Sequence, residues 1–139
     1  MNLVTDRTRA DVLLGTEKGQ YGVADLNRVE GAVAELSALA KALDIHYEPE
    51  VKTDWDLPGV FSSDRWPTQE QMTRYLSNVA GLCNAVEIAA DLPVTMEHLN
   101  WEGANRIEQA LNLVYTRIET ILQAFQYSGE FFAGEESGL

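Results

Sequence analysis

The sequence has a single cysteine among its 139 residues, and that shortage excludes two kinds of stabilisation. One thiol cannot form an intrachain disulfide, and it cannot supply the several thiolate ligands of a structural zinc site. Long apolar runs are also missing, so no stretch predicts a membrane-spanning helix. Asp6, Arg7 and Arg9 interrupt the apolar core that a signal peptide needs. We therefore expect a soluble protein of a reducing cytoplasm, with Cys83 as a buried thiol.

Basic residues are scarce as well. Ten Lys and Arg face 22 Asp and Glu, which gives a net charge of −12 and a pI near 4.4. The basic residues are scattered singly from Arg7 to Arg117, so they form no basic stripe. A strongly negative protein repels phosphate backbones and anionic lipid headgroups. We expect neither a nucleic acid nor a membrane as a partner.

The sequence also lacks the motifs of common catalytic and cofactor sites. It contains neither the Gly-x-Ser-x-Gly nucleophile motif nor a Gly-rich phosphate-binding loop. His46 and His98 have no second ligand at a suitable spacing. The acidic stretch 54–59 begins like a calcium-binding loop, but Arg65 stands where that loop needs a bidentate Glu. We predict that the protein is not an enzyme and has no catalytic residue, no cofactor and no metal site.

What the sequence does contain is a set of apolar seams with the three-and-four spacing of helices that pack together. The most regular seam predicts a helix over residues 101–127, and its members are Ala104, Ile107, Leu111, Val114, Ile118, Ile121 and Phe125. A second row on this helix, Trp101, Tyr115 and Leu122, predicts contact with two neighbours. Similar seams predict helices over 25–44 and from 69 to about 90. The fold class is therefore all-α.

Capping residues set the expected helix starts. Thr68 followed by Gln71 is a capping-box pattern, and Asn100 is a suitable cap for the last helix. Thr5 or Thr8 can cap a short first helix that stops before Gly15.

We predict an up-down-up three-helix bundle with the short first helix lying across it. Residues 1–128 form the single bundle domain, and 129–139 form a flexible tail. The connection 45–67 has no clear period and is rich in aromatic residues, which predicts that it folds back over one end of the bundle.

This topology places the long connection and the tail at the same end, where aromatic residues gather. Aromatic side chains dominate protein-binding hot spots. The predicted protein-binding residues are Trp55, Phe61, Trp66, Phe131 and Phe132. The alternative is that these side chains only cover the open end of the bundle.

An internal echo relates two predicted helices, since residues 26–30 (LNRVE) match 104–108 (ANRIE). Glu30 and Glu108 could pair as metal ligands in a bundle, but such proteins need a His three residues after the Glu, and none stands there. We instead predict a structural role for Asn27, Glu30, Asn105 and Glu108. The amides of Asn27 and Asn105 can bond backbone groups of nearby loops.

Four segments resemble a family of small uncharacterised phage and prophage proteins from tail or baseplate regions of Gram-positive bacteria. They are YGVADLNRVE (21–30), DRWPTQEQMTRYLSNV (64–79), LPVTM (92–96) and LNWEGANRIE (99–108). The resemblance covers most of the chain but implies a genomic setting, with no catalytic residue. The family's usual Thr before the Asp-Leu-Asn run is Ala24 here, which moves the expected N-cap to Asp25.

The resemblance implies a non-enzymatic virion or tail-assembly component that acts through protein contacts. Its expected partners are other phage tail or virion proteins, with self-association as a further possibility. Its expected location is the host bacterial cytoplasm during assembly, or the virion. Two alternatives remain open: a cytoplasmic adaptor or inhibitor that uses its acidic surface, and a small enzyme in an unfamiliar bundle.

Overall fold

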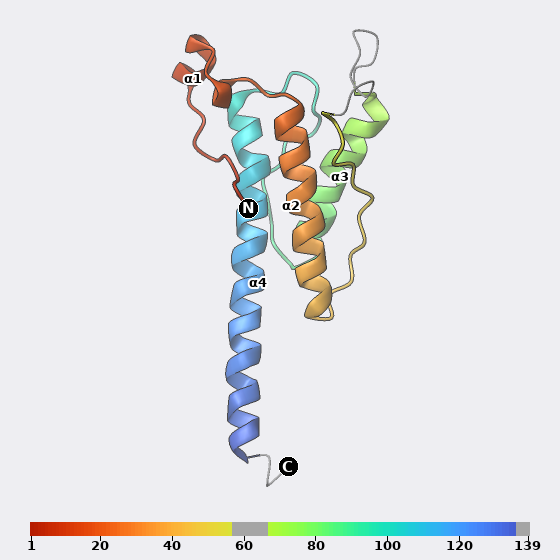
Figure 1. The fold of residues 1–139 in the computed structure, drawn as a ribbon, viewed down its shortest axis with the longest axis vertical. Helices are drawn as coiled ribbons and strands as arrows, with labels where there is room; N and C mark the ends of the chain where they lie inside the picture. The colour runs from red at the N-terminus through yellow and green to blue at the C-terminus, as the bar shows by residue number, and fades with distance from the viewer. Residues whose placement is uncertain (57–66, 136–139) are drawn as a thin grey trace.

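Figure 1 shows an all-helical molecule in the part of the chain that the structure describes. The structure is a computed structural model that describes residues 1–56 and 67–135, with side chains up to Ala124. Its helices are α1 (Arg9–Leu14), the 3-10 helix η1 (Glu17–Gly19), α2 (Val23–Ala42), α3 (Gln69–Ala85) and α4 (Trp101–Glu135). The predicted all-α class is confirmed. Within these residues, no helix is long and apolar enough to cross a bilayer.

The three long helices all run in the same direction, so the predicted up-down-up connectivity is wrong (Figure 1). The N-terminal halves of α2 and α4 lie together, because Arg28 on α2 bonds Glu108 on α4. The N-terminal half of α3 lies beside the start of α2, because Tyr21, just before α2, shares a hydrogen bond with Tyr75 on α3. In a parallel pair, the end of one helix lies a full helix length from the start of the next. The chain must therefore travel back along the bundle twice.

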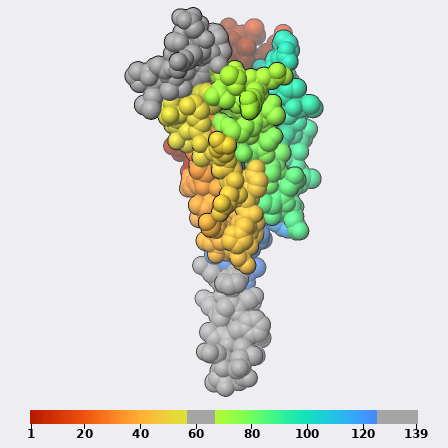
Figure 2. All heavy atoms as spheres, turned by 90° about the vertical axis from the view of Figure 1, so that its right-hand side faces the viewer, coloured from red at the N-terminus to blue at the C-terminus, as the bar shows by residue number. Residues whose placement is uncertain are grey.

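The first return segment, residues 45–56, is called the first strap. It runs against the direction of α2, since the N–H of Lys52 donates to Glu30 and the N–H of Trp55 donates to Asn27, each at 3.0 Å. The side chain of Asn78 on α3 donates to the carbonyl of the strap at residue 50. Figure 2 shows this strap, in yellow, on the surface between α2 and α3.

The second return segment, residues 86–100, is called the second strap and runs against the direction of α4. The carbonyl of Val86 accepts a hydrogen bond from Arg117, whereas Asp91 pairs with Arg106 at 3.2 Å, nearer to the start of α4. Parallel packing explains why both connections are long, including the aromatic-rich stretch 45–67.

The ends of α2 and α3 share one geometry that turns the chain back into a strap. Asp44 and Glu87 adopt the left-handed conformation, with φ of 64° and 61°. The N–H of each following isoleucine donates to the carbonyl five residues earlier. This is the Schellman motif, whose left-handed residue is usually glycine. No glycine marks these ends in the sequence. The predicted ends at 44 and about 90 are therefore later than the observed ends at Ala42 and Ala85.

Helix starts follow the capping rules at three of the four expected places. Side chains of Thr8, Thr68 and Asn100 each accept an N–H from the first turn of the following helix. The predicted N-cap of α2 is wrong: the cap is Gly22, and Asp25 accepts its N–H at 2.8 Å.

The core lies where α2, α3 and α4 face one another, and the predicted seam of α4 is buried as far as Ile118. Helix α4 contacts both α2 and α3, as predicted, but Tyr115 and Leu122 of the predicted second row are 38% and 40% exposed. Helix α4 also crosses the predicted boundary between bundle and tail, and it ends at Glu135. Residues 136–139 lie outside the described part.

Candidate functional site

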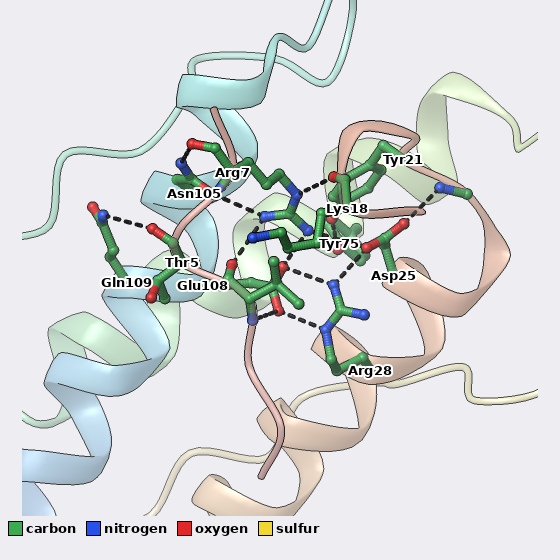
Figure 3. Close-up of polar contacts among 12 residues, drawn as sticks. Thr5, Arg7, Lys18, Tyr21, Asp25, Arg28, Tyr75, Asn105, Glu108 and Gln109 are labelled. Atoms are coloured by element: carbon green, nitrogen blue, oxygen red, sulfur yellow. Dashed lines mark hydrogen bonds and ion pairs between the residues drawn. The ribbon is translucent and has the colours of Figure 1, made fainter. Parts of the chain in front are cut away.

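A buried network of charged side chains surrounds Glu108 (Figure 3). The carboxylate of Glu108 is fully buried and accepts hydrogen bonds from Arg7 at 2.6 Å, from Arg28 at 2.7 Å and from the N–H of Val4 at 2.9 Å. Asp25 accepts from both of these arginines. Two carboxylates thus face two guanidinium groups, and the charges balance. The bonds to Glu108 raise the pKa of Arg28, which keeps this side chain charged.

A second network surrounds Glu30 on α2, which is 1% exposed. Its carboxylate accepts hydrogen bonds from Arg74 on α3, from the N–H of Lys52 at 3.0 Å and from the indole N–H of Trp55. Arg74 also donates to the carbonyl of Glu50. The first strap is therefore fixed to both α2 and α3 through one carboxylate and one guanidinium group.

The two networks repeat one contact pattern, which we call the Asn-Glu clamp. Each clamp holds a four-residue segment outside the helices: 52–55 (KTDW) beside Asn27 and Glu30, and 4–7 (VTDR) beside Asn105 and Glu108. The asparagine accepts the N–H of the last residue of the segment, and the glutamate accepts the N–H of the first. The side chain of the last residue also donates to the glutamate. The echo in the sequence thus corresponds to a repeated structural unit.

The hydroxyl groups of Tyr21 and Tyr75 share a hydrogen bond beside the Glu108 network (Figure 3). Burial raises the pKa of both phenols, and in Tyr75 the neighbouring Tyr21 raises it further. Both groups therefore stay neutral at physiological pH.

The structure places the four polar residues that the sequence singled out in the two clamps, two in each. Of the predicted protein-binding residues, it describes the side chain of Trp55. Trp55 is 2% exposed and bonded to Glu30, so it belongs to the core and not to a docking surface. It also lies near the start of α2, whereas α4 ends at the opposite end of the molecule (Figure 1). Among the others, Phe61 and Trp66 lie outside the described residues. So do the side chains of Phe131 and Phe132.

Sequence reasoning missed the three arginines that neutralise the clamps, Arg7, Arg28 and Arg74. It also missed the two segments that the clamps hold. The repeated Thr-Asp pair at 5–6 and 53–54 is the signal that could have found these segments. The repeat of this pair is not seen together with the repeat of the helices. The two Thr-Asp pairs lie 48 positions apart and the two asparagines 78 positions apart, so no single alignment offset matches both.

The charged and polar groups of the two networks bond one another and the chain's own backbone. In the described part of the chain, no group of three His, Cys, Asp or Glu side chains could hold a metal ion. The side chain of Arg106 there contains the one buried polar atom without a hydrogen-bond partner. Burial raises the pKa of the Cys83 thiol, which makes it a poor nucleophile. The arrangement binds the chain's own segments 4–7 and 52–55.

A groove of about 1000 Å³ lies between the starts of α2 and α3 and residues 94–99 of the second strap. Its lining is largely apolar and includes Leu26, Met72, Leu76 and Met96. Among the described residues of the lining, Glu97 is the charged one. Comparison with known protein families, curated proteins and solved structures found no match, and no activity is carried over to this chain.

Proposed function

We propose that the protein is a non-enzymatic structural or assembly component of a phage or prophage tail region, and that it works through protein contacts. The observation that carries the proposal is the length of α4. It has 35 residues, whereas α2 has 20 and α3 has 17. The part of α4 that extends beyond α2 and α3 has a surface that another chain can contact (Figure 1).

The interior supports the same proposal. The buried acids and arginines of the clamps hold the chain's own backbone, so the energy of these contacts stabilises a rigid body and is not available for a substrate. The phage setting comes from the four sequence segments given above. In this proposal the protein is made in the host bacterial cytoplasm and acts there during assembly, or is retained in the virion.

The test is genetic and uses the genome that encodes the chain. In-frame deletion of the gene should abolish infectious tailed particles after induction, and a copy supplied in trans should restore them. Electron microscopy of the particles tells tail defects from head defects. Full titre with normal tails from the deletion strain would refute the proposal.

A truncated copy tests whether the end of α4 takes part. A gene that lacks residues 129–139 should yield a chain with nearly the wild-type melting temperature that no longer restores particles. If these residues instead served the core, the melting temperature would fall, because removing two buried aromatic side chains costs several kcal/mol, about 3 to 5 for each.

A further inference from the structure

We propose that the overhang of α4, residues 119–135, is the docking helix for an apolar helix flanked by Lys and Arg on another protein. This inference rests on the proposed function and names the chemistry of the partner. It commits to a partner of opposite charge and excludes a second copy of this chain.

The overhang begins where packing within the bundle stops. Ile118 is 3% exposed, and it is the last buried side chain of α4 in the described part. Of the six residues that follow, five are exposed and Ile121 is intermediate. Helix α4 continues to Glu135, and at 1.5 Å per residue the overhang is about 25 Å long. Figure 1 shows it projecting beyond α2 and α3.

The apolar spacing of the core does not stop where the packing stops. The alternation of three and four positions that buries Ile107, Leu111, Val114 and Ile118 continues in the sequence at 121, 125, 128 and 132. Three of these four positions hold Ile or Phe, and Leu122 widens the row with a side chain that is 40% exposed. This pattern is typical of a helix with a partner along its whole length.

The overhang has little packing of its own. Most of the stability of a helix in a protein comes from the packing of its apolar face, and five of the six side chains from 119 to 124 are exposed. Gly129 and Gly134 each lower helix stability relative to alanine. A second helix packed on the apolar row would offset this cost, as in helix-in-groove and coiled-coil recognition.

Charge decides which partner fits. From Ile118 to the end of the sequence there is no Lys, Arg or His, but there are four glutamates, at 119, 130, 135 and 136. Pairing two copies along this segment would bring like charges together, which is unfavourable. A helix with Lys or Arg beside its apolar row has complementary charge.

A pair of model peptides tests this chemistry against the full-length chain. Both peptides have about three heptads with Leu at the a and d positions, and their e and g positions hold Lys in one and Glu in the other. Fluorescence anisotropy measures each dissociation constant at low and at physiological salt. The Lys peptide should bind at least about tenfold more tightly than the Glu peptide, and the difference should shrink as salt screens the charges.

Two matched variants separate docking on the overhang from general attraction to an acidic protein. Leu122→Asp places a charge on the overhang. Leu113→Asp is the control, because it makes the same change at another exposed leucine of α4, which is 50% exposed. Leu113 lies nine positions before Leu122, and at about 100° per residue this places it on the opposite face of the helix. L122D should weaken binding of the Lys peptide at least about tenfold, whereas L113D should change it less than about twofold.

Three results would overturn the proposal: no binding of the Lys peptide, equal binding of the two peptides, or equal effects of the two variants. Sedimentation that shows a dimer of the wild-type chain and a monomer of L122D would also overturn it, because the occupant would then be a second copy. A protein that fails these tests but is still required for tailed particles would keep the proposed function and lose only this surface.

Discussion

The Asn-Glu clamps predict that Glu108→Gln is much more destabilising than Glu30→Gln, although the same substitution is made at equivalent positions. Glutamine has nearly the shape of glutamate, so neither change leaves a cavity. The difference lies in the arginines. The side chain of Arg7, held by Glu108, is 2% exposed, whereas that of Arg74, held by Glu30, is 21% exposed.

The expected magnitudes follow from what each arginine can reach after the substitution. With Glu108 neutral, Arg28, which is 21% exposed, can turn toward water, but Arg7 stays buried and keeps Asp25 as its carboxylate partner in place of two. Removing one partner of a buried pair costs about 3 to 5 kcal/mol. With Glu30 neutral, the partly exposed guanidinium group of Arg74 can bond water and keep its hydrogen bond to the carbonyl of Glu50. A lost hydrogen bond to a charged group costs about 1.5 to 3 kcal/mol.

Equilibrium unfolding in urea, followed by circular dichroism, measures both variants against the wild type. Equal m-values show that the same surface is exposed on unfolding, so that midpoints can be compared. We expect the free energy of unfolding to be lower for E108Q than for E30Q by about 1 kcal/mol or more. Equal losses, or a loss below about 1 kcal/mol for E108Q, would refute the idea that the Glu108 network is an electrostatic unit closed to water.

Three further predictions concern single contacts. Asn105→Leu should cost about 1 to 3 kcal/mol, because it leaves the N–H and carbonyl of a buried residue unpaired; an unchanged urea midpoint would contradict this. Because burial raises the pKa of Tyr21 and Tyr75, stability should be unaffected by these groups below about pH 10 and fall above it, by up to about 1.4 kcal/mol per pH unit for each. The double variant Y21F/Y75F should flatten this fall, and it should cost less than the sum of the two single variants, each of which leaves one buried hydroxyl unpaired. Glu87→Gly should raise the melting temperature, since φ of 61° is unstrained in glycine, with a gain of about 0.5 to 1 kcal/mol; a lower melting temperature would show that its side chain matters more than the strain.

Sequence periodicity and capping chemistry predicted most of the helical structure. The seam of α4 and the caps at Thr8, Thr68 and Asn100 depend on local spacing, which a single sequence displays directly. The ends of α2 and α3 could not be predicted in this way, because Asp44 and Glu87 occupy a conformation that usually requires glycine. There the packing of the following isoleucines against the core outweighs local preference.

Helix direction could not be read from the seams, since an apolar row is the same in either direction. The length of the connection 45–67 was the available clue, because a short turn suffices between antiparallel helices but not between parallel ones. The wrong direction then placed Trp55 at the wrong end and on the surface. In the structure, parallel helices bring the strap back to Asn27 and Glu30, where the indole is buried.

The part of the candidate site that lies within the repeated segments 26–30 and 104–108 was predictable from the sequence. The pattern around Asn27 and Asn105 drew attention to amides that bond backbone groups, and the structure places each beside one of the two clamped segments. The arginines were not predictable, because Arg7 is separated from Glu108 by 101 positions and no local pattern connects them.

That separation also determines when the protein can finish folding. The segment 4–7 is synthesised well before its partners on α4, because 98 to 104 positions separate the bonded residues. Until α4 has left the ribosome, Arg7 has no carboxylate of Glu108 to pair with, and the core between α2 and α4 stays open. Contacts of such long range slow folding, since the cost of closing the loop precedes the gain from the contact. The contacts between segment 4–7 and α4 therefore form late in folding. The bundle cannot fold stepwise during synthesis in the way that separate domains do.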